Sequence, residues 1–248
     1  MKRRSLGQHY LVDHSVVDRL VSAAGLQGTE IVVEIGTGKG ILTKELASRC
    51  KRLEGFEVDR GNYEETLTVT AANNVLIRLE DAFDAKPTFD VIVSSLPYSR
   101  SQNFVEWISQ LGYDRGVVVL QRDFVDKIRS PPGTRDYRAI SVIAQVSLEM
   151  KELGSVNASS FKPSPRVSSV ILAIRPKIRL SAEEIARIKT LFSLRRRRAS
   201  NVLERFGFAT RFDDFGTRRI SSLTPDEVHQ ICDNNFREAT EAIGERRT

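Results

Sequence analysis

The sequence predicts an α/β protein with a doubly wound parallel sheet, followed by a small all-helical domain. Strand-like and helix-like segments alternate over the first 150 residues, and such alternation is typical of parallel strands joined by right-handed helical crossovers. From Ser181 onward the pattern indicates helices only. We therefore expect a first domain over residues 1–178 and a second, helical domain over residues 179–248.

Each strand of the first domain is predicted from an apolar segment rich in β-branched residues. The expected strands cover residues 30–35, 53–58, 75–79, 89–94 and 116–121, with a late strand at 167–174. Amphipathic spacing predicts helices at residues 41–50, 102–111, 181–194, 199–206 and 224–242. The helices that begin near Ser181 and Thr224 each carry a glutamate three residues later, which is the pattern of a capping box.

Composition excludes several classes of protein. The 248 residues are 40% hydrophobic and 28% charged, as in ordinary globular proteins. Neither Cys50 nor Cys232 belongs to a CxxC pair, which argues against a disulfide framework or a structural zinc site. No apolar run approaches the ~20 residues that span a bilayer, and no apolar signal core follows the basic N-terminus. We expect a cytoplasmic protein that acts as a monomer, with no metal ion and no membrane partner.

Positive charge is concentrated in the last two-fifths of the chain. Residues 1–150 hold 19 basic and 20 acidic side chains, whereas residues 151–248 hold 19 basic and 12 acidic ones. A basic segment beside a neutral one favours a polyanionic partner, most often a nucleic acid. On charge alone, a solvated ionic surface is an equal alternative.

Three groups at the ends of successive strands outline a nucleoside pocket. The turn Gly36-Thr37-Gly38-Lys39-Gly40 follows the first strand and opens a helix, where backbone amides can approach a ligand closely. Glu57 ends the second strand, about 20 residues later, where a carboxylate can accept ribose hydroxyls. Asp81 follows the third strand and could accept from an adenine amino group. The alternatives are a structural turn and, for Asp81, a helix cap.

The tetrapeptide Ser95-Leu96-Pro97-Tyr98 follows the fourth strand and is the most diagnostic feature of the chain. The proline fixes the direction of the Leu96 carbonyl, which together with the Ser95 hydroxyl can accept hydrogen bonds from an exocyclic amine. Two acceptors localise the nitrogen lone pair and favour the positive charge that develops during methyl transfer. Tyr98 can stack on the base. A plain strand-to-loop turn is the alternative interpretation.

The ordered motifs of this chain resemble those of the KsgA-type ribosomal small-subunit RNA adenine dimethyltransferases, which are Rossmann-like enzymes dependent on S-adenosylmethionine (SAM). The resemblance runs over nearly the whole length. It rests on LGQHYL (6–11), VEIGTGKGILT (33–43), EVDR (57–60), EDA (80–82), SLPY (95–98), QRDF (121–124), FKPSPRVSSV (161–170) and FSLRRRRASN (192–201).

The resemblance implies a SAM site, a target-base site and a folded RNA substrate. The cofactor residues would be Gln8, His9, Leu11, Gly36, Gly38, Glu57, Val58, Asp81, Ala82 and Ser95. The residues of the transfer site would be Ser95, Leu96, Pro97, Tyr98 and Phe161, with Phe161 stacking on a flipped adenine opposite Tyr98. The partner would be the RNA of an immature small ribosomal subunit.

Arginine is the commonest candidate for RNA contact in the basic region, because its fork suits phosphates and its plane can stack on bases. The run Arg195-Arg196-Arg197-Arg198 is expected at a helix end or turn, and Arg205, Arg211, Arg218 and Arg219 follow it. Arg122, Lys162 and Arg166 could add contacts near the pocket. An exposed ionic face accounts for some of these arginines, but not readily for four in a row.

Ser95 stands where the family usually has asparagine, and this departure keeps a second function open. A shorter side chain affects a second methylation of the same nitrogen more than the first. The chain could therefore act chiefly as a ribosome-assembly factor that binds RNA and methylates weakly or only once. A nucleotide-dependent oxidoreductase, supported by the glycine turn alone, and a DNA adenine methyltransferase are further alternatives.

Overall fold

The computed structural model describes residues 9–205 and 217–233, which fold into two compact units. The first unit holds β1 (Tyr10–Leu11), α1 (His14–Ala24), β2 (Ile31–Ile35), α2 (Ile41–Ala47), β3 (Arg52–Glu57), α3 (Arg60–Val69), β4 (Val75–Leu79), β5 (Val91–Ser95), η1 (Tyr98–Arg100), α4 (Ser101–Ile108), β6 (Arg115–Gln121), β7 (Leu148–Val156), η2 (Ala158–Ser160), β8 (Phe161–Lys162) and β9 (Ser169–Pro176). The second unit holds α6 (Ala139–Ser147), α7 (Ala182–Ser193), α8 (Ala199–Arg205), η4 (Ile220–Ser222) and α9 (Pro225–Cys232), and α5 (Arg122–Ile128) crosses from one unit to the other.

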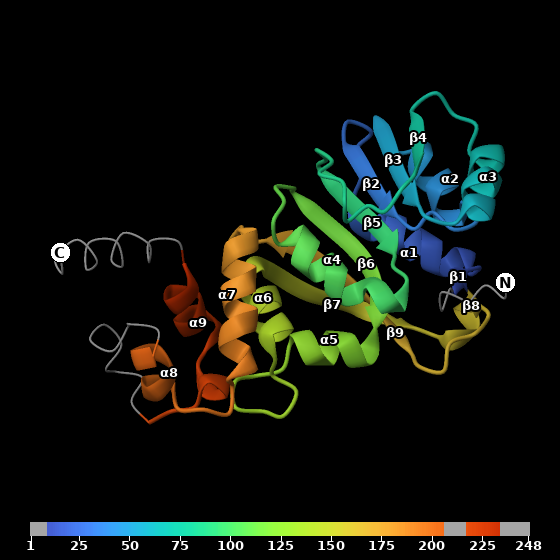
Figure 1. Ribbon diagram of the computed structural model, residues 1–248. Helices are drawn as coiled ribbons and strands as arrows, with labels where there is room; N and C mark the ends of the chain where they lie inside the picture. Colours follow the sequence, from blue (N-terminus) through green and yellow to red (C-terminus); the bar gives the residue numbers. More distant parts are fainter. Residues whose placement is uncertain (1–8, 206–216, 234–248) are drawn as a thin grey trace, which may run out of the picture. The chain divides into compact units, whose positions relative to one another are not determined.

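The central sheet has seven strands in the order β4-β3-β2-β5-β6-β9-β7 (Figure 1). The first five are parallel, which confirms the α/β class and the Rossmann-like parallel arrangement. The last two, β9 and β7, are antiparallel to their neighbours, so the sheet is mixed at this edge. Because β2, β3, β4 and β5 are parallel neighbours, their carboxyl ends meet at one edge of the sheet.

The strand β7 was not predicted. Its side chains alternate along most of its length between exposed and partly buried, and a bulge interrupts its pairing with β9 between Glu152 and Gly154. An edge strand with one solvated face lacks the continuous apolar run that marks the buried parallel strands. Its partner β9 was predicted, but the antiparallel direction of both strands depends on a pairing between distant segments.

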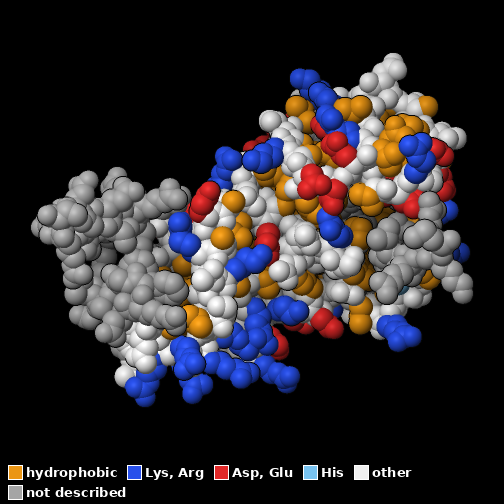
Figure 2. Space-filling model, viewed as in Figure 1, with side chains coloured by type: hydrophobic (Ala, Val, Ile, Leu, Met, Phe, Trp, Pro, Cys, Tyr) orange, Lys and Arg blue, Asp and Glu red, His pale blue; other side chains and the backbone are white. Residues whose placement is uncertain are grey.

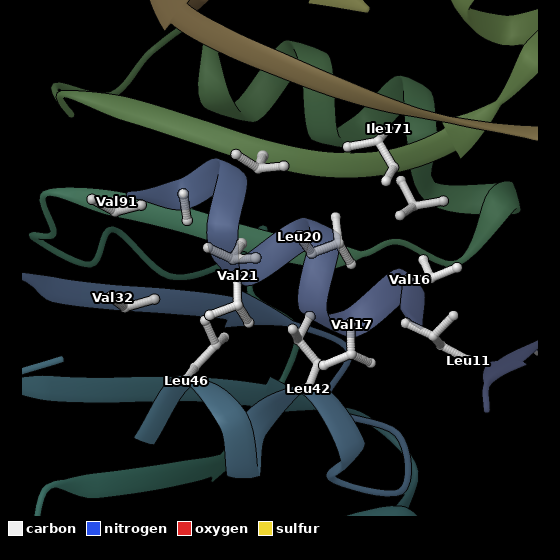
Figure 3. Packing of buried hydrophobic residues seen from close by; sticks show 14 of the residues in the cluster. Leu11, Val16, Val17, Leu20, Val21, Val32, Leu42, Leu46, Val91 and Ile171 are labelled. Atoms are coloured by element: carbon white, nitrogen blue, oxygen red, sulfur yellow. The ribbon is translucent and has the colours of Figure 1, made fainter. Parts of the chain in front are cut away.

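The main core lies between the sheet and the helices α1 and α2. Val17 and Leu20 of α1 are fully buried, and Leu46 of α2 packs with them (Figure 3). The α1 helix is fixed at both ends, since the Asp13 side chain caps its first turn and Gly25 ends it in the left-handed conformation. On the other face of the sheet lies α4 (Figure 1). This packing holds the carboxyl ends of the strands in place.

The second unit combines residues 126–147 with residues 178–248, so it includes a segment that the sequence placed in the first domain. The helix α6 is buried over almost its whole length and packs against α7 and α9. Tyr137, just before α6, donates a hydrogen bond to the carbonyl of Leu223 at 3.0 Å and contacts the Phe192 ring edge-on. Because α6 is apolar on all sides, its sequence has no amphipathic pattern from which its place in the second unit could be predicted.

Both predicted capping boxes are present in the second unit, at the starts of α7 and α9. The helix α9 ends at Cys232, where Asp233 has an extended backbone, and residues 234–242 of the predicted range 224–242 lie outside the described residues. Among residues 9–205 and 217–233, no helix is both long and apolar enough to cross a membrane.

Candidate active site

A cavity of about 330 Å³ lies at the carboxyl ends of β2, β3, β4 and β5. Nine of the residues predicted for the cofactor line this cavity together: His9, Leu11, Gly36, Gly38, Glu57, Val58, Asp81, Ala82 and Ser95. The tenth, Gln8, lies outside the described residues. The cavity therefore collects groups from four strand ends and from the N-terminal segment, which are far apart in the sequence.

The glycine turn forms one wall of the cavity. The backbone conformation of this turn requires residues without a Cβ at two positions. Gly38 has a φ of +55°, and a Cβ there would lie 3.3 Å from the Tyr10 ring. Gly40 has a φ of +78° and caps α2, and a Cβ there would meet Val69 at 2.5 Å. Side chains are disfavoured at both positions, and both amides are engaged within the protein: the Gly38 amide donates to the Glu57 carboxylate and the Gly40 amide to the Thr37 carbonyl, each at 2.9 Å.

Glu57, the last residue of β3, is held by three backbone amides. Its Oε2 accepts from the Gly38 amide at 2.9 Å, and its Oε1 accepts from the amides of Val58 and Asp59 at 2.8 and 2.9 Å. Only 4% of the residue is exposed. The carboxylate is thereby fixed in one orientation against the glycine turn, and its Oε2 keeps a lone pair with which it can accept a further hydrogen bond.

Asp81 follows β4 and makes two contacts that orient it. Its Oδ1 accepts from the Phe83 amide at 3.0 Å, and its Oδ2 accepts from the guanidinium of Arg100. That guanidinium also lies over the Phe83 ring, 4.8 Å from the ring centroid. Phe83 and Arg100 both line the cavity. Neither was predicted, because the partners of this contact come from different strand ends.

Glu34 is an unpredicted carboxyl group in the cavity wall. It lies within β2, between apolar neighbours, and only 1% of it is exposed. Its Oε2 makes no hydrogen bond. Burial raises the pKa of this carboxyl to about 8, and the nearby charge of Glu57 adds to the shift. A polar residue in the apolar run IVVEI was the signal that could have identified it.

The predicted transfer tetrapeptide lies partly inside the cavity and partly beside it. Ser95, at the end of β5, and Pro97 line the cavity, whereas Leu96 is buried with 2% exposure. The Tyr98 hydroxyl forms a 2.6 Å hydrogen bond with the Ser169 hydroxyl. Its ring lies 5.3 Å from the His9 ring, between centroids. Burial raises the pKa of the Tyr98 phenol.

The expected aromatic sandwich of Tyr98 and Phe161 is not formed in this structure. The two rings meet edge-on, with centroids 6.2 Å apart and planes at 68°, whereas stacking on a base requires parallel faces. Phe161 is 2% exposed and belongs to the main core. The reason is the pairing of β8 with β1, which places Phe161 opposite Leu11 and turns it inward.

Tyr10 and Asn62 are further cavity residues that sequence patterns did not reveal. The Asn62 side chain donates to the Tyr10 hydroxyl at 3.3 Å, and the Lys39 ammonium lies 5.9 Å from the Tyr10 ring centroid. These contacts join β1 to the glycine turn and to α3. Only the tertiary fold brings them together.

Some of the side chains predicted to contact RNA form ion pairs with glutamates of the protein, and others are exposed to solvent. Arg122 binds Glu152 through two hydrogen bonds of 2.8 and 2.6 Å, so its guanidinium already has a carboxylate partner. Lys162 and Arg166 are exposed. Arg218 pairs with Glu227, the side chain of Arg205 is not described, and Arg211 lies outside the described residues.

Three of the four consecutive arginines surround an open depression of about 470 Å³ in the second unit. Arg195, Arg196 and Arg197 lie in the turn between α7 and α8, and Arg138, which was not predicted, completes the depression from the start of α6. Arg198 is exposed next to them. Figure 2 shows Lys and Arg side chains gathered over this end of α7 and the loop before α6. Burial and the charges of Arg138 and Arg196 lower the pKa of Arg195.

Within the described part of the chain, no group of three or more histidine, cysteine, aspartate or glutamate side chains is arranged so that it could hold a metal ion.

Comparison with known proteins agrees with this geometry. The family model described as ribosomal RNA adenine dimethylase matches residues 1–233. The ribosomal RNA small subunit methyltransferase A of Thermotoga petrophila is 32% identical over 253 residues, covering 98% of this chain and 95% of its own length. A probable ribosomal RNA small subunit methyltransferase A of Pyrococcus abyssi is 30% identical over 240 residues, covering 91% and 89%.

Two solved structures share the fold at lower identity. A dimethyladenosine transferase from Plasmodium falciparum superposes with a TM-score of 0.76 at 22% identity, covering 90% of this chain and 96% of its own. The 23S rRNA methyltransferase ErmE superposes with a TM-score of 0.61 at 22% identity, covering 90% and 98%. The family match over nearly the whole chain, together with the cavity at the strand ends, shows that this chain belongs to the ribosomal RNA adenine dimethylase family.

Proposed function

We propose that this protein transfers methyl groups from SAM to the 6-amino group of adenine in small-subunit ribosomal RNA, in the cytoplasm, and that it dimethylates two adjacent adenines. The observation that carries the proposal is the convergence of Glu57, Asp81 and Ser95 on one cavity beside the glycine turn. The names of the relatives supply the substrate class, since they are methyltransferases of small-subunit ribosomal RNA.

The residues of the cavity fit this cofactor. Glu57 is fixed where its remaining lone pair can accept from a ribose hydroxyl, and Asp81 offers acceptors for an adenine amino group. The unpartnered Oε2 of Glu34 marks a place in the wall that a ligand bearing a cation or a donor would complete. When bound, SAM supplies an electrophilic methyl group on a sulfonium.

Ser95 and the Leu96 carbonyl are proposed to act on the target amine. An adenine amino nitrogen is a weak nucleophile because its lone pair is delocalised into the ring. By accepting the two amine hydrogens, the hydroxyl and the carbonyl localise this lone pair and stabilise the charge that develops on nitrogen. Ser95 is suited to this role because it lies at the end of β5 and lines the cavity.

The arginines of the second unit are proposed to hold the RNA by its phosphates. Arg138 and Arg195–Arg197 surround one depression, and the charges of Arg138 and Arg196 act on Arg195 together with the opposing charge of Asp136. Guanidinium groups around an open depression favour binding of an anion, and folded RNA is recognised largely through shape and backbone.

Labelled methyl transfer onto immature small subunits, followed by nucleoside analysis, tests the proposal. We expect dimethyladenosine with the wild-type protein and a large loss of product with Ser95→Ala, while binding of S-adenosylhomocysteine is retained. DNA substrates and mature subunits serve as controls. Absence of methylated adenine with every RNA substrate would reject the proposal, and full activity of Ser95→Ala would reject the role of Ser95.

The serine at position 95 favours one alternative, in which the protein is chiefly an assembly factor that binds RNA and methylates weakly or once. Mass spectrometry of the same reaction separates the two functions. Dimethyladenosine as the main product supports the enzyme, whereas monomethyladenosine or unmodified RNA with tight subunit binding supports the assembly factor. Ser95→Asn is then expected to raise the share of dimethylated product.

A further inference from the structure

Arg100 joins the two halves of the candidate site. It is the last residue of η1, two residues after the tetrapeptide 95–98, and its amide donates to the Pro97 carbonyl at 2.9 Å. Its side chain extends to the turn after β4, where the guanidinium contacts the Asp81 carboxylate. The side chains of Arg100 and Asp81 are 37% and 31% exposed, so the pair is partly accessible to solvent.

The contact leaves Asp81 with a defined orientation. One carboxylate oxygen is held by the Phe83 amide and the other by Arg100, and each oxygen keeps a second lone pair. Phe83 is itself supported, since its ring meets Trp107 edge-on with centroids 5.7 Å apart, and the Trp107 indole donates to the Ala85 carbonyl. The guanidinium therefore has a rigid aromatic surface beneath it.

We propose that Arg100 is a positioning residue that sets the specificity of the cofactor site for adenine, by holding the Asp81 carboxylate in a fixed orientation as an acceptor for the 6-amino group. This inference depends on the proposed function, because it assumes that the adenine of the cofactor lies beside Asp81. A carboxylate accepts a hydrogen bond from a 6-amino group but repels the carbonyl oxygen that inosine carries at the same place. Discrimination between the two bases should therefore depend on Arg100.

The test measures binding by titration calorimetry of the full chain with S-adenosylhomocysteine and with S-inosylhomocysteine, which lacks the 6-amino group. For Arg100→Met we expect the Kd of S-adenosylhomocysteine to rise roughly fivefold to tenfold, because the charge-assisted hydrogen bond from the 6-amino group to Asp81 is weakened. The Kd of the inosine analogue, which cannot donate this hydrogen bond, should change less. Arg100→Lys keeps the charge without the planar fork and should recover part of the discrimination.

Arg49→Met is the matched control. Arg49 pairs with Glu45 at 2.7 Å with a comparable exposure of 44% and 33%, and it does not line the cavity. We expect both ligands to bind this variant as they bind the wild type. If Arg100→Met does not fold, Arg100→Lys carries the test alone, with partial loss of discrimination as the expected result.

The outcomes separate this inference from the proposed function. Failure of the wild-type protein to bind S-adenosylhomocysteine would reject the cofactor assignment itself. Tight wild-type binding with unchanged discrimination in Arg100→Met would reject only the role of Arg100. An equal increase in the Kd of both ligands for Arg100→Met would show that Arg100 has only a structural role. A lower Kd for this variant would show that Arg100 obstructs the site. Each of these results overturns the proposal.

Discussion

The substitution Glu34→Gln should make the protein more stable at pH 8 while changing little at pH 4.5. Glu34 lies in the middle of β2, is almost completely buried, and has a carboxylate oxygen without a hydrogen bond. Ionising such a group in the folded state is costly because water cannot solvate the charge. Glutamine has nearly the same shape as a protonated glutamate and carries no charge at any pH.

The size and sign of the effect follow from linkage between folding and protonation. The pKa of Glu34 rises from its ordinary value of 4.5 to about 8, and each unit corresponds to about 1.4 kcal/mol. Below pH 4.5 the carboxyl is protonated in the folded and the unfolded chain. Between pH 4.5 and 8 the unfolded chain releases a proton that the folded chain keeps, so the free energy of unfolding falls as the pH rises, by on the order of 5 kcal/mol in total.

The assay is denaturant unfolding of both proteins at pH 5, 6, 7 and 8, and the quantity of interest is the difference between their free energies of unfolding. We expect this difference to grow in favour of Glu34→Gln with each step. A difference that stays constant with pH would refute the reasoning, because it would show that Glu34 ionises alike in the two states.

Glu30 lies just before the same strand, and Glu30→Gln serves as a control because its effect on the free energy of unfolding should depend on pH in the opposite direction. Burial of Glu30 opposes ionisation, but the Arg115 guanidinium and the amides of Gln27 and Thr29 outweigh it and hold the pKa of this carboxyl below 4.5. Its ionised form stabilises the fold above pH 4.5, and this contribution is lost as the pH falls through the lowered pKa. Glu30→Gln should therefore cost more stability at pH 7 than at pH 4.

Three further predictions concern other parts of the site. Tyr98→Phe removes a hydrogen bond to a buried serine and should lower the free energy of unfolding by about 1–3 kcal/mol, as measured by denaturant unfolding. Gly38→Ala should weaken binding of S-adenosylhomocysteine, whereas Gly28→Ala, which also has a positive φ but no neighbour within 4 Å, should leave that affinity unchanged in the same calorimetric titration. Arg196→Ala combined with Arg197→Ala should weaken RNA binding and reduce its salt dependence, and the log–log slope should change by about 0.7–0.9 for each phosphate that is no longer neutralised.

Features that depend on local sequence were predicted well. The strand β4 has the predicted bounds, and β2, β3, β5 and β6 lie within one or two residues of theirs, because an apolar β-branched run followed by a turn is a local signal. The capping boxes at Ser181 and Thr224 are local for the same reason. Parallel order then placed Glu57, Asp81 and Ser95 at one edge without further information.

Features that depend on pairing between distant segments were not predicted. The position of Phe161 follows from the pairing of β8 with β1, and an aromatic residue after a turn has no pattern that distinguishes a core position from a stacking position. Arg100 meets Asp81 across two strand ends, and Arg138 meets the arginine run across the second unit. In each case the motif could be read in the sequence, but its partner could not.

The positions that break local rules are those that line the cavity. A carboxyl group inside an apolar strand lowers stability at neutral pH, and no hydrogen bond within the described protein compensates Glu34 Oε2. Natural sequences tolerate such a destabilising group where activity depends on it. A ligand that places a positive group beside this oxygen would lower the pKa of Glu34 and recover part of the lost stability as binding energy. The lower stability of the free protein above pH 5 and its affinity for a cationic ligand would then have the same origin, and Glu34→Gln should raise that stability while weakening that affinity.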